Sequence, residues 1–215
     1  MTLIDSKASI EEISKLEKKN KDFAKVVKIA LLLNFLMFFL EFLFGIYANS
    51  MALITDSFDF LGDSLNYIIA IYVLKKSSKF QSYSAIIKSL SMLFFGLFVS
   101  FLAIQKALSQ EIYIPSSFLM VLIASIALLV NISVSFLLFK FRNGNSNQKS
   151  VWLCSRNDAI NNIMVIVAGL FVYRYSSIWP DIIAASIMAI LAISSSISIF
   201  KSAKKEIKIY KKNSL

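Results

Sequence analysis

The sequence contains no histidine, one cysteine, two prolines and five glycines among its 215 residues. The single cysteine, Cys154, excludes a disulfide bond within the chain. Because proline and glycine are scarce, we expect few turns and long helices. Residues 1–28 are polar and rich in lysine, without the apolar stretch of a cleavable signal peptide, and we therefore expect no such peptide.

Apolar side chains are abundant instead: 57% of the residues are hydrophobic and only 17% are charged. A soluble domain usually has about 45–50% apolar residues. The composition therefore indicates an all-α, polytopic membrane protein. The net charge of +10 does not indicate nucleic-acid binding, because the basic residues lie in short loops and tails beside apolar segments.

Six apolar segments are long enough to span a membrane, since about 20 helical residues cross about 30 Å of hydrocarbon. We expect membrane helices at residues 26–49, 51–74, 86–108, 118–140, 151–173 and 178–200. The chain then consists of an N-terminal tail (1–25), a six-helix transmembrane domain (26–200) and a short basic tail (201–215).

Lysine and arginine are distributed unevenly between the ends of these segments. Twenty of the 23 lie in the two tails and in the second-to-third and fourth-to-fifth loop regions. Lys88 is counted in the second-to-third loop region. Only Lys106 and Arg174 lie on the opposite side, and Arg156 lies within the fifth segment. The positive-inside rule puts both termini in the cytoplasm. We expect a multi-pass protein of the cell (inner) membrane.

Two polar stretches outside these segments have recognisable patterns. "SIEE" at Ser9–Glu12 fits a capping box, and Ile10, Ile13 and Leu16 follow at helical spacing. We interpret this stretch as a short amphipathic helix on the inner membrane surface; the alternative is a solvated tail. "FRNGNSNQKS" at Phe141–Ser150 is typical of a flexible loop.

Three aspartates, Asp56, Asp59 and Asp63, interrupt the apolar second segment. At 100° per residue they point in directions of about 0°, 300° and 340°, and therefore share one narrow helix face with Asn66. An uncompensated carboxylate in the membrane costs at least a few kcal/mol. A cation is the obvious partner; the alternatives are protonated acids or salt bridges. No lysine or arginine lies at central depth in the first, second or fourth segment, which makes a salt bridge hard to form.

The fifth segment contains the complementary stretch "WLCSRNDAINN", Trp152–Asn162. Cys154, Asp158 and Asn162 are four residues apart and span only about 80° of the helix. Asp63 lies about 18 Å, and Asp158 about 20 Å, from the outer side, so both fall near the bilayer middle. The spacing therefore predicts one polar cluster made of Asp59, Asp63, Cys154 and Asp158.

These stretches resemble the cation diffusion facilitator family over residues 25–205. The family's metal site looks like a pair of His/Asp-x-x-x-Asp motifs, one on the second helix and one on the fifth. Here "DFLGD" has Asp59 and Asp63, and "CSRND" has Asp158, with Cys154 in the place usually held by His or Asp. "ANSMALITDS", "LVNISVSFLLFKFRNGN" and "WPDIIAASIMAI" also resemble the family. Many members carry a C-terminal cytoplasmic domain; we expect none here, because only 15 residues follow the sixth segment, and the resemblance to short, transmembrane-only members is therefore closer.

The resemblance implies efflux of a divalent transition-metal cation by alternating access. A mixed set of oxygen and sulfur ligands suits Zn²⁺, Cd²⁺ or Co²⁺ better than Mg²⁺ or Ca²⁺, while the absence of histidine leaves Mn²⁺ and Fe²⁺ open. Cys154 is either a ligand or a small apolar side chain. Desolvation and mutual repulsion favour protonated acids in the empty site, and metal binding then releases protons. We therefore predict metal/proton antiport.

The expected partners are the metal ion, protons, the lipid bilayer and a second copy in a homodimer; we expect no resident cofactor and no nucleic acid. Glu41 in the first segment fits a proton path, an outer vestibule or a hydrogen-bonded structural acid. Asp56 fits the outer vestibule, or the surroundings of the ligands. Asn34 and Asn131 are typical of hydrogen bonds between membrane helices.

Two other classes of protein need consideration. An intramembrane aspartic protease also needs two membrane aspartates, but its Gly-x-Gly-Asp motif is broken here by Phe60 in "FLGD". A membrane subunit that binds metal without transporting it is the second alternative. We therefore expect a transporter and not an enzyme, and a flux assay in liposomes separates the three classes.

Overall fold

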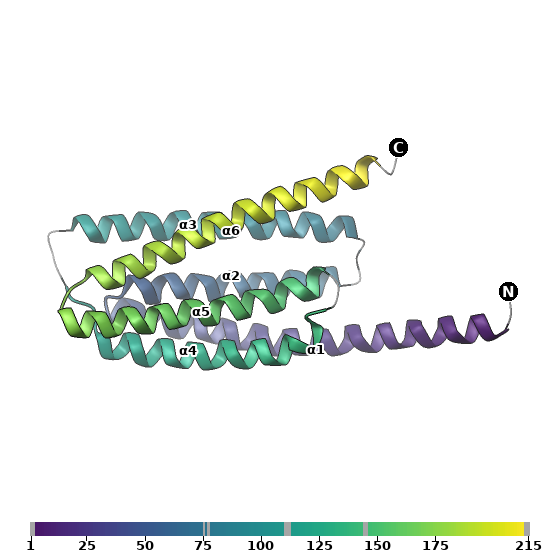
Figure 1. Cartoon of the computed structure of the whole chain (residues 1–215), viewed down its shortest axis with the longest axis horizontal. Coiled ribbons are helices and arrows are strands. Elements are labelled where there is room, and N and C mark those ends of the chain that lie inside the picture. Colours follow the sequence, from purple (N-terminus) through teal and green to yellow (C-terminus); the bar gives the residue numbers. More distant parts are fainter. Residues whose placement is uncertain (1–2, 75, 77, 110–112, 144–145, 213–215) are drawn as a thin grey trace.

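The computed structural model describes residues 3–74, 76, 78–109, 113–143 and 146–212. Within these residues the chain forms six α-helices and one short 3₁₀ helix, and no strand (Figure 1). The elements are α1 (Leu3–Tyr47), α2 (Met51–Val73), α3 (Ser78–Leu108), α4 (Ser117–Leu138), η1 (Phe139–Phe141), α5 (Ser146–Tyr175) and α6 (Trp179–Lys212). The all-α prediction is confirmed, and one helix covers each predicted segment.

Four of these helices are long and apolar enough to cross a membrane, judged over the described residues. They are Glu17–Tyr47 of α1, Tyr83–Leu108 of α3, Ser117–Phe141 of α4 and η1, and Trp179–Ile209 of α6. α2 and α5 do not belong to this set: α2 contains the three aspartates, and α5 contains both acidic and basic residues. The four apolar helices make the chain a multi-pass membrane protein.

The structure changes the expected ends of four segments; α3, for example, begins at Ser78 instead of residue 86. The separate surface helix expected near Ser9 is instead the first part of α1, which is continuous from Leu3 to Tyr47 because good helix formers follow one another without proline. α5 already begins at Ser146, inside the expected loop, and α6 continues to Lys212, inside the expected tail. The N-terminal end of α1 and the C-terminal end of α6 extend from the same end of the bundle (Figure 1).

α2 is the central helix of the bundle and contacts the other five α-helices. α1 packs along it, α4 pairs with α5, and α3 pairs with α6. Large apolar side chains such as Leu32, Phe94, Phe118, Leu129 and Ile190 point outward and are exposed. An exposed apolar surface of this extent suits lipid rather than water.

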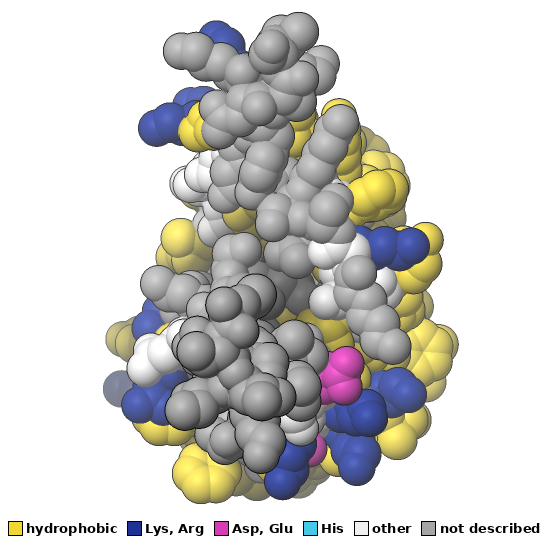
Figure 2. All heavy atoms as spheres, turned by 90° about the vertical axis from the view of Figure 1, so that its right-hand side faces the viewer, with side chains coloured by type: hydrophobic (Ala, Val, Ile, Leu, Met, Phe, Trp, Pro, Cys, Tyr) yellow, Lys and Arg dark blue, Asp and Glu magenta, His cyan; other side chains and the backbone are white. Residues whose placement is uncertain are grey.

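Basic side chains gather at the end of the bundle from which both termini extend. Figure 2 looks onto this end and shows lysine and arginine side chains around its described part. This distribution agrees with the charge asymmetry of the sequence.

α3 and α6 approach closely because small residues lie between them. A Cβ atom added to Gly96 would lie 2.8 Å from Ile193 Cγ1, so only glycine fits there without a shift. The Ser196 hydroxyl donates to the Ser89 carbonyl oxygen across the same contact, at 2.6 Å. This close pair forms one wall of the cavity described below.

The start of α2 is attached to α6 by one buried carboxylate, Asp181. Its oxygens accept from the Ser50 hydroxyl at 2.6 Å, from the Met51 N–H at 2.7 Å and from the Ala52 N–H at 2.9 Å. Lys106 of α3 adds an ion pair at 3.3 Å. A helix N-terminus has free N–H groups and favours an anion, so this contact fixes where α2 begins.

Candidate metal site

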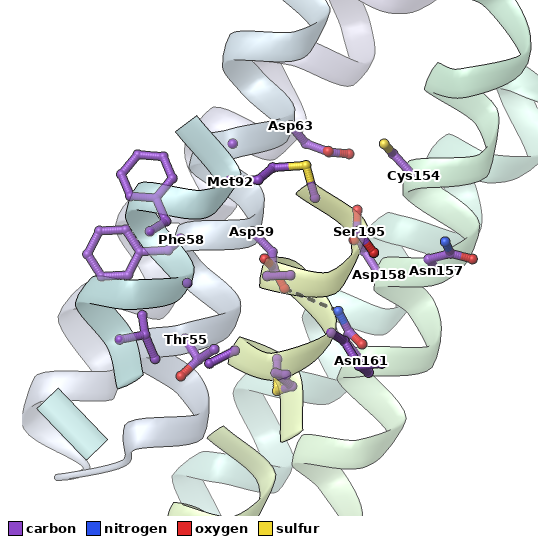
Figure 3. A pocket seen from close by; sticks show the side chains of 18 of the residues that line it. Thr55, Phe58, Asp59, Asp63, Met92, Cys154, Asn157, Asp158, Asn161 and Ser195 are labelled. Atoms are coloured by element: carbon purple, nitrogen blue, oxygen red, sulfur yellow. Dashed lines mark hydrogen bonds between the residues drawn. The ribbon is translucent and has the colours of Figure 1, made fainter. Parts of the chain in front are cut away.

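A cavity of about 560 Å³ lies between α2, α3, α5 and α6. All four candidate residues from the sequence line it: Asp59 and Asp63 from α2, and Cys154 and Asp158 from α5. Figure 3 shows Asp63 and Cys154 pointing toward each other across the cavity. The structure thus brings the two sequence motifs together, as their spacing and depth predicted.

Asp63 is held by neighbours on its own helix. It accepts hydrogen bonds from Asn66 Nδ2 at 3.3 Å and from the Tyr67 hydroxyl at 3.0 Å. The Tyr67 hydroxyl is also hydrogen-bonded to Ser155 Oγ of α5, at 2.7 Å. These contacts orient one carboxylate and connect α2 to the helix that carries Cys154.

The other two acids of the cavity have fewer hydrogen-bond donors. Asp59 accepts from Asn161 Nδ2 of α5 at 3.1 Å, the bond drawn in Figure 3. The Asp158 carboxyl lies within hydrogen-bonding reach of the Asp63 carboxyl. Two acceptors that face each other attract a proton or a cation between them.

Lys88 of α3 is a cavity residue that our sequence interpretation placed in the cytoplasmic loop region. Its Nζ donates to Cys154 Sγ at 3.0 Å, and it lines the cavity together with the three acids. Lys88 lies in the third segment, outside the first, second and fourth segments that lack a central lysine or arginine. The signal was present: Lys88, Met92 and Val99 lie on one stripe of the third helix, and all three line the cavity.

The described residues contain no group of three or more cysteine or acidic side chains already gathered closely enough to hold a metal ion. The candidate ligands contact amide, hydroxyl and ammonium donors instead. A cation that enters this cavity therefore has to replace those donors, which requires the candidate ligand side chains to move.

Our assignment of Asp56 to the outer vestibule or to the surroundings of the ligands stays a prediction, but this side chain does not itself line the cavity. Its direction differs from that of Asp59 by about 60° around the helix, enough to turn it toward a different neighbour. It is fully buried, accepts a hydrogen bond from Asn162 Nδ2, and lies beside Glu41 of α1.

The two other membrane asparagines behave differently from each other. Asn131 of α4 donates to Asn162 Oδ1 of α5 at 3.0 Å, which confirms the predicted bond between helices. Asn34 donates to the carbonyl oxygen of Ala30, one turn earlier in its own helix, at 2.9 Å. For Asn34 the observed bond is therefore local and not the predicted interhelical one.

Comparison with known proteins gives a family match over most of the chain. Residues 27–207 match the model of the cation efflux transmembrane domain. A protein of Bacillus velezensis (strain DSM 23117 / BGSC 10A6 / LMG 26770 / FZB42) described as "Cadmium, cobalt and zinc/H(+)-K(+) antiporter" is 26% identical over 192 residues, covering 81% of this chain and 61% of the relative. A protein of Bacillus subtilis (strain 168) with the same description is 23% identical over 192 residues, covering 81% of this chain and 61% of the relative. The chain thus spans about 61% of the length of these relatives.

Proposed function

Because this chain belongs to the cation efflux family, we propose that it exports a divalent transition-metal cation through the cavity between α2, α3, α5 and α6. The observation that carries the proposal is the meeting of the two acidic motifs, from α2 and α5, in one cavity inside a multi-pass membrane protein. The substrates that we favour are Zn²⁺, Cd²⁺ and Co²⁺, the cations that appear in the descriptions of the two relatives.

The proposed ligands are Asp59, Asp63 and Asp158, with Cys154 as the fourth. Carboxylate oxygens and one thiolate make a mixed set that suits a four-coordinate, borderline-soft cation, with Mn²⁺ and Fe²⁺ as further candidates. Cys154 can join this set only after the Lys88 ammonium leaves its sulfur, since the two are in contact at 3.0 Å. Binding therefore displaces a positive side chain as well as protons.

The proposed topology has six spans in residues 26–200, with both termini in the cytoplasm and the protein in the cell membrane. α2 and α5 would span the membrane inside a ring of more apolar helices, since α2 contacts all five other α-helices. The position of both chain ends at one end of the bundle supports an even number of spans. Association of two copies through the exposed apolar helix faces would complete the unit.

Proton antiport follows from the chemistry of the acids in the cavity. A carboxylate that binds a cation cannot keep its proton, so metal binding releases protons and protonation releases metal. Opening of the cavity to each side in turn then exchanges the two substrates. Asn66, Tyr67 and Asn161 hold the acids between these events by donating hydrogen bonds to them.

The test is a flux assay with purified protein in liposomes. We expect Asp63→Asn and Asp158→Asn to reduce Zn²⁺ and Cd²⁺ flux at least about 100-fold, because each change removes a charged ligand from a water-poor site. Asp22→Asn, the same chemical change outside the cavity, is the matched control and should transport normally. Flux near the wild-type rate in both cavity variants would show that the site is elsewhere. Metal binding without flux in the wild type would favour the non-transporting subunit.

A further inference from the structure

Two acids lie outside the cavity, at a junction of α1, α2, α4 and α5: Glu41 and Asp56. Both are fully buried, with exposed fractions of 0%. Their carboxyl groups lie within hydrogen-bonding reach of each other. Asn162 donates to one oxygen of Asp56. The other oxygen of Asp56 and both oxygens of Glu41 have no hydrogen-bond partner among the described residues.

The charged groups on the neighbouring helices do not neutralise this pair. The titratable residues that lie nearest in sequence to Asp56 on α2 and to Asn162 on α5 are themselves acids, Asp59 and Asp158. α4 contains no titratable residue. On the described part of α3, Lys88 contacts the cavity cysteine and Lys106 is paired with Asp181 at the start of α2. Among the described residues, no lysine or arginine is therefore paired with Glu41 or Asp56.

Two ionised carboxylates cannot remain side by side in such a place. Burial of an unpaired charge costs several kcal/mol, and mutual repulsion adds to this cost. One proton removes the repulsion and halves the buried charge, because the protonated carboxyl becomes a donor to its neighbour and the pair keeps a single, shared negative charge. Carboxylate pairs that share a proton behave as one titrating unit.

We propose that Glu41 and Asp56 form a proton-binding site, distinct from the metal cavity, that holds one shared proton. Three buried oxygens without a hydrogen-bond partner, on two neighbouring carboxyl groups, carry this assignment. The amide chain Asn131–Asn162–Asp56 orients the pair from the opposite side, since each of its hydrogen bonds runs toward the carboxylate.

α2 and α5 connect this proton site with the metal cavity. A coupling between the two sites rests on the proposed function. Asp56 lies one turn before Asp59 on α2, and Asn162 lies one turn after Asp158 on α5. A divalent cation in the cavity adds positive charge nearby and so favours ionisation of the pair. Metal binding should therefore release the shared proton in addition to protons of the cavity acids.

Infrared spectroscopy of the purified, metal-free protein in lipid vesicles at pH 7 tests the proton site directly. A protonated, buried carboxyl has a C=O band distinct from carboxylate bands. We expect Glu41→Gln to remove one such component, because the new amide donates to Asp56 and no proton is needed. Asp56→Asn should remove the same component for the same reason, so either variant suffices if the other fails to fold. Asp22→Asn and Asp63→Asn should retain it.

Two outcomes would overturn the proposal. One is a protonated-acid band of wild-type intensity in both Glu41→Gln and Asp56→Asn. The other is a protonated-acid band of the wild type that is present in Na⁺ buffer and absent in K⁺ or Li⁺ buffer. In that case a monovalent metal ion would occupy the site in place of the proton. Neither result depends on whether the protein transports metal.

Calorimetry with Zn²⁺ in buffers of different ionisation enthalpy tests the link to the cavity. We expect Glu41→Gln to bind Zn²⁺ within about threefold of the wild-type affinity while releasing about one proton fewer per ion. An unchanged proton count would overturn the link. If the wild type bound no Zn²⁺, the proposed function would fail, whereas the infrared result would still decide the proton site.

Discussion

Buried carboxylates have different partners at the start of α2 and in the cavity further along the same helix. At the start of α2, one carboxylate, Asp181, accepts three hydrogen bonds and is paired with Lys106. In the cavity, three carboxylates lie near a single lysine, whose ammonium contacts sulfur. A carboxylate with a full set of donors is a structural anchor. Three carboxylates beside a single lysine lack positive charge and need cations or protons from outside.

The largest effect that separates these regions concerns stability. We expect Asp181→Ala to lower the free energy of unfolding by about 3 kcal/mol, because it leaves Lys106 and the first N–H groups of α2 without their partner. Asp63→Ala is the matched change in the cavity and should cost less than about 1 kcal/mol, since Tyr67 keeps its bond to Ser155. Thermal unfolding in detergent measures both.

The opposite ranking of the two variants would reject the comparison. If Asp63→Ala unfolded at the lower temperature and Asp181→Ala melted like the wild type, the cavity acid would be the anchor. Zn²⁺ binding provides the second readout. The folded fraction of Asp181→Ala should bind Zn²⁺ normally, and Asp63→Ala should not bind it.

The parts that could be predicted from the sequence are those determined within one helix. Helical geometry puts Asp59 and Asp63 on one face and Cys154 and Asp158 on another, and the structure places all four in one cavity. Hydropathy locates all six helices to within a few residues, apart from the polar extensions of α1, α3, α5 and α6.

The parts that could not be predicted depend on how helices rotate and shift against each other. Asp181 meets the start of α2 across 130 residues of sequence, and no local pattern encodes that contact. Lys88 shares one stripe of the third helix with Met92 and Val99, but which neighbour that stripe faces depends on the packing of α3. The pairing of Glu41 with Asp56 likewise depends on the rotation of α1 against α2.

The second prediction concerns pH and applies to the cavity alone. Protons and metal compete for Asp59, Asp63 and Asp158, so a lower pH weakens metal binding and a higher pH strengthens it. We expect the apparent Zn²⁺ affinity to fall about tenfold per pH unit for each proton displaced, between pH 8 and pH 6. Metal titrations in lipid nanodiscs measure this slope. An affinity that does not change with pH would mean that no proton is displaced, and antiport would be excluded.

The third prediction compares the two lysines. We expect Lys88→Gln to raise Zn²⁺ affinity about fivefold, because a positive charge no longer faces the divalent ion. Lys88→Arg keeps the charge and should bind like the wild type. Lys106→Gln is the control at the anchor and should lower the melting temperature without changing Zn²⁺ affinity. Weaker Zn²⁺ binding in Lys88→Gln would mean that the lysine supports the site instead of competing with the cation.

The smallest effect concerns Cys154 and decides whether sulfur belongs to the ligand set. Thiolate favours soft cations, so Cys154→Ser should weaken Cd²⁺ binding about threefold or more and leave Mn²⁺ binding nearly unchanged. Serine can still accept a hydrogen bond from Lys88, so the change removes the soft ligand and keeps the polar contact. Competition titrations of the two metals measure the ratio directly. Equal loss for both metals, or none, would mean that Cys154 only fills space and that the carboxylates alone form the site.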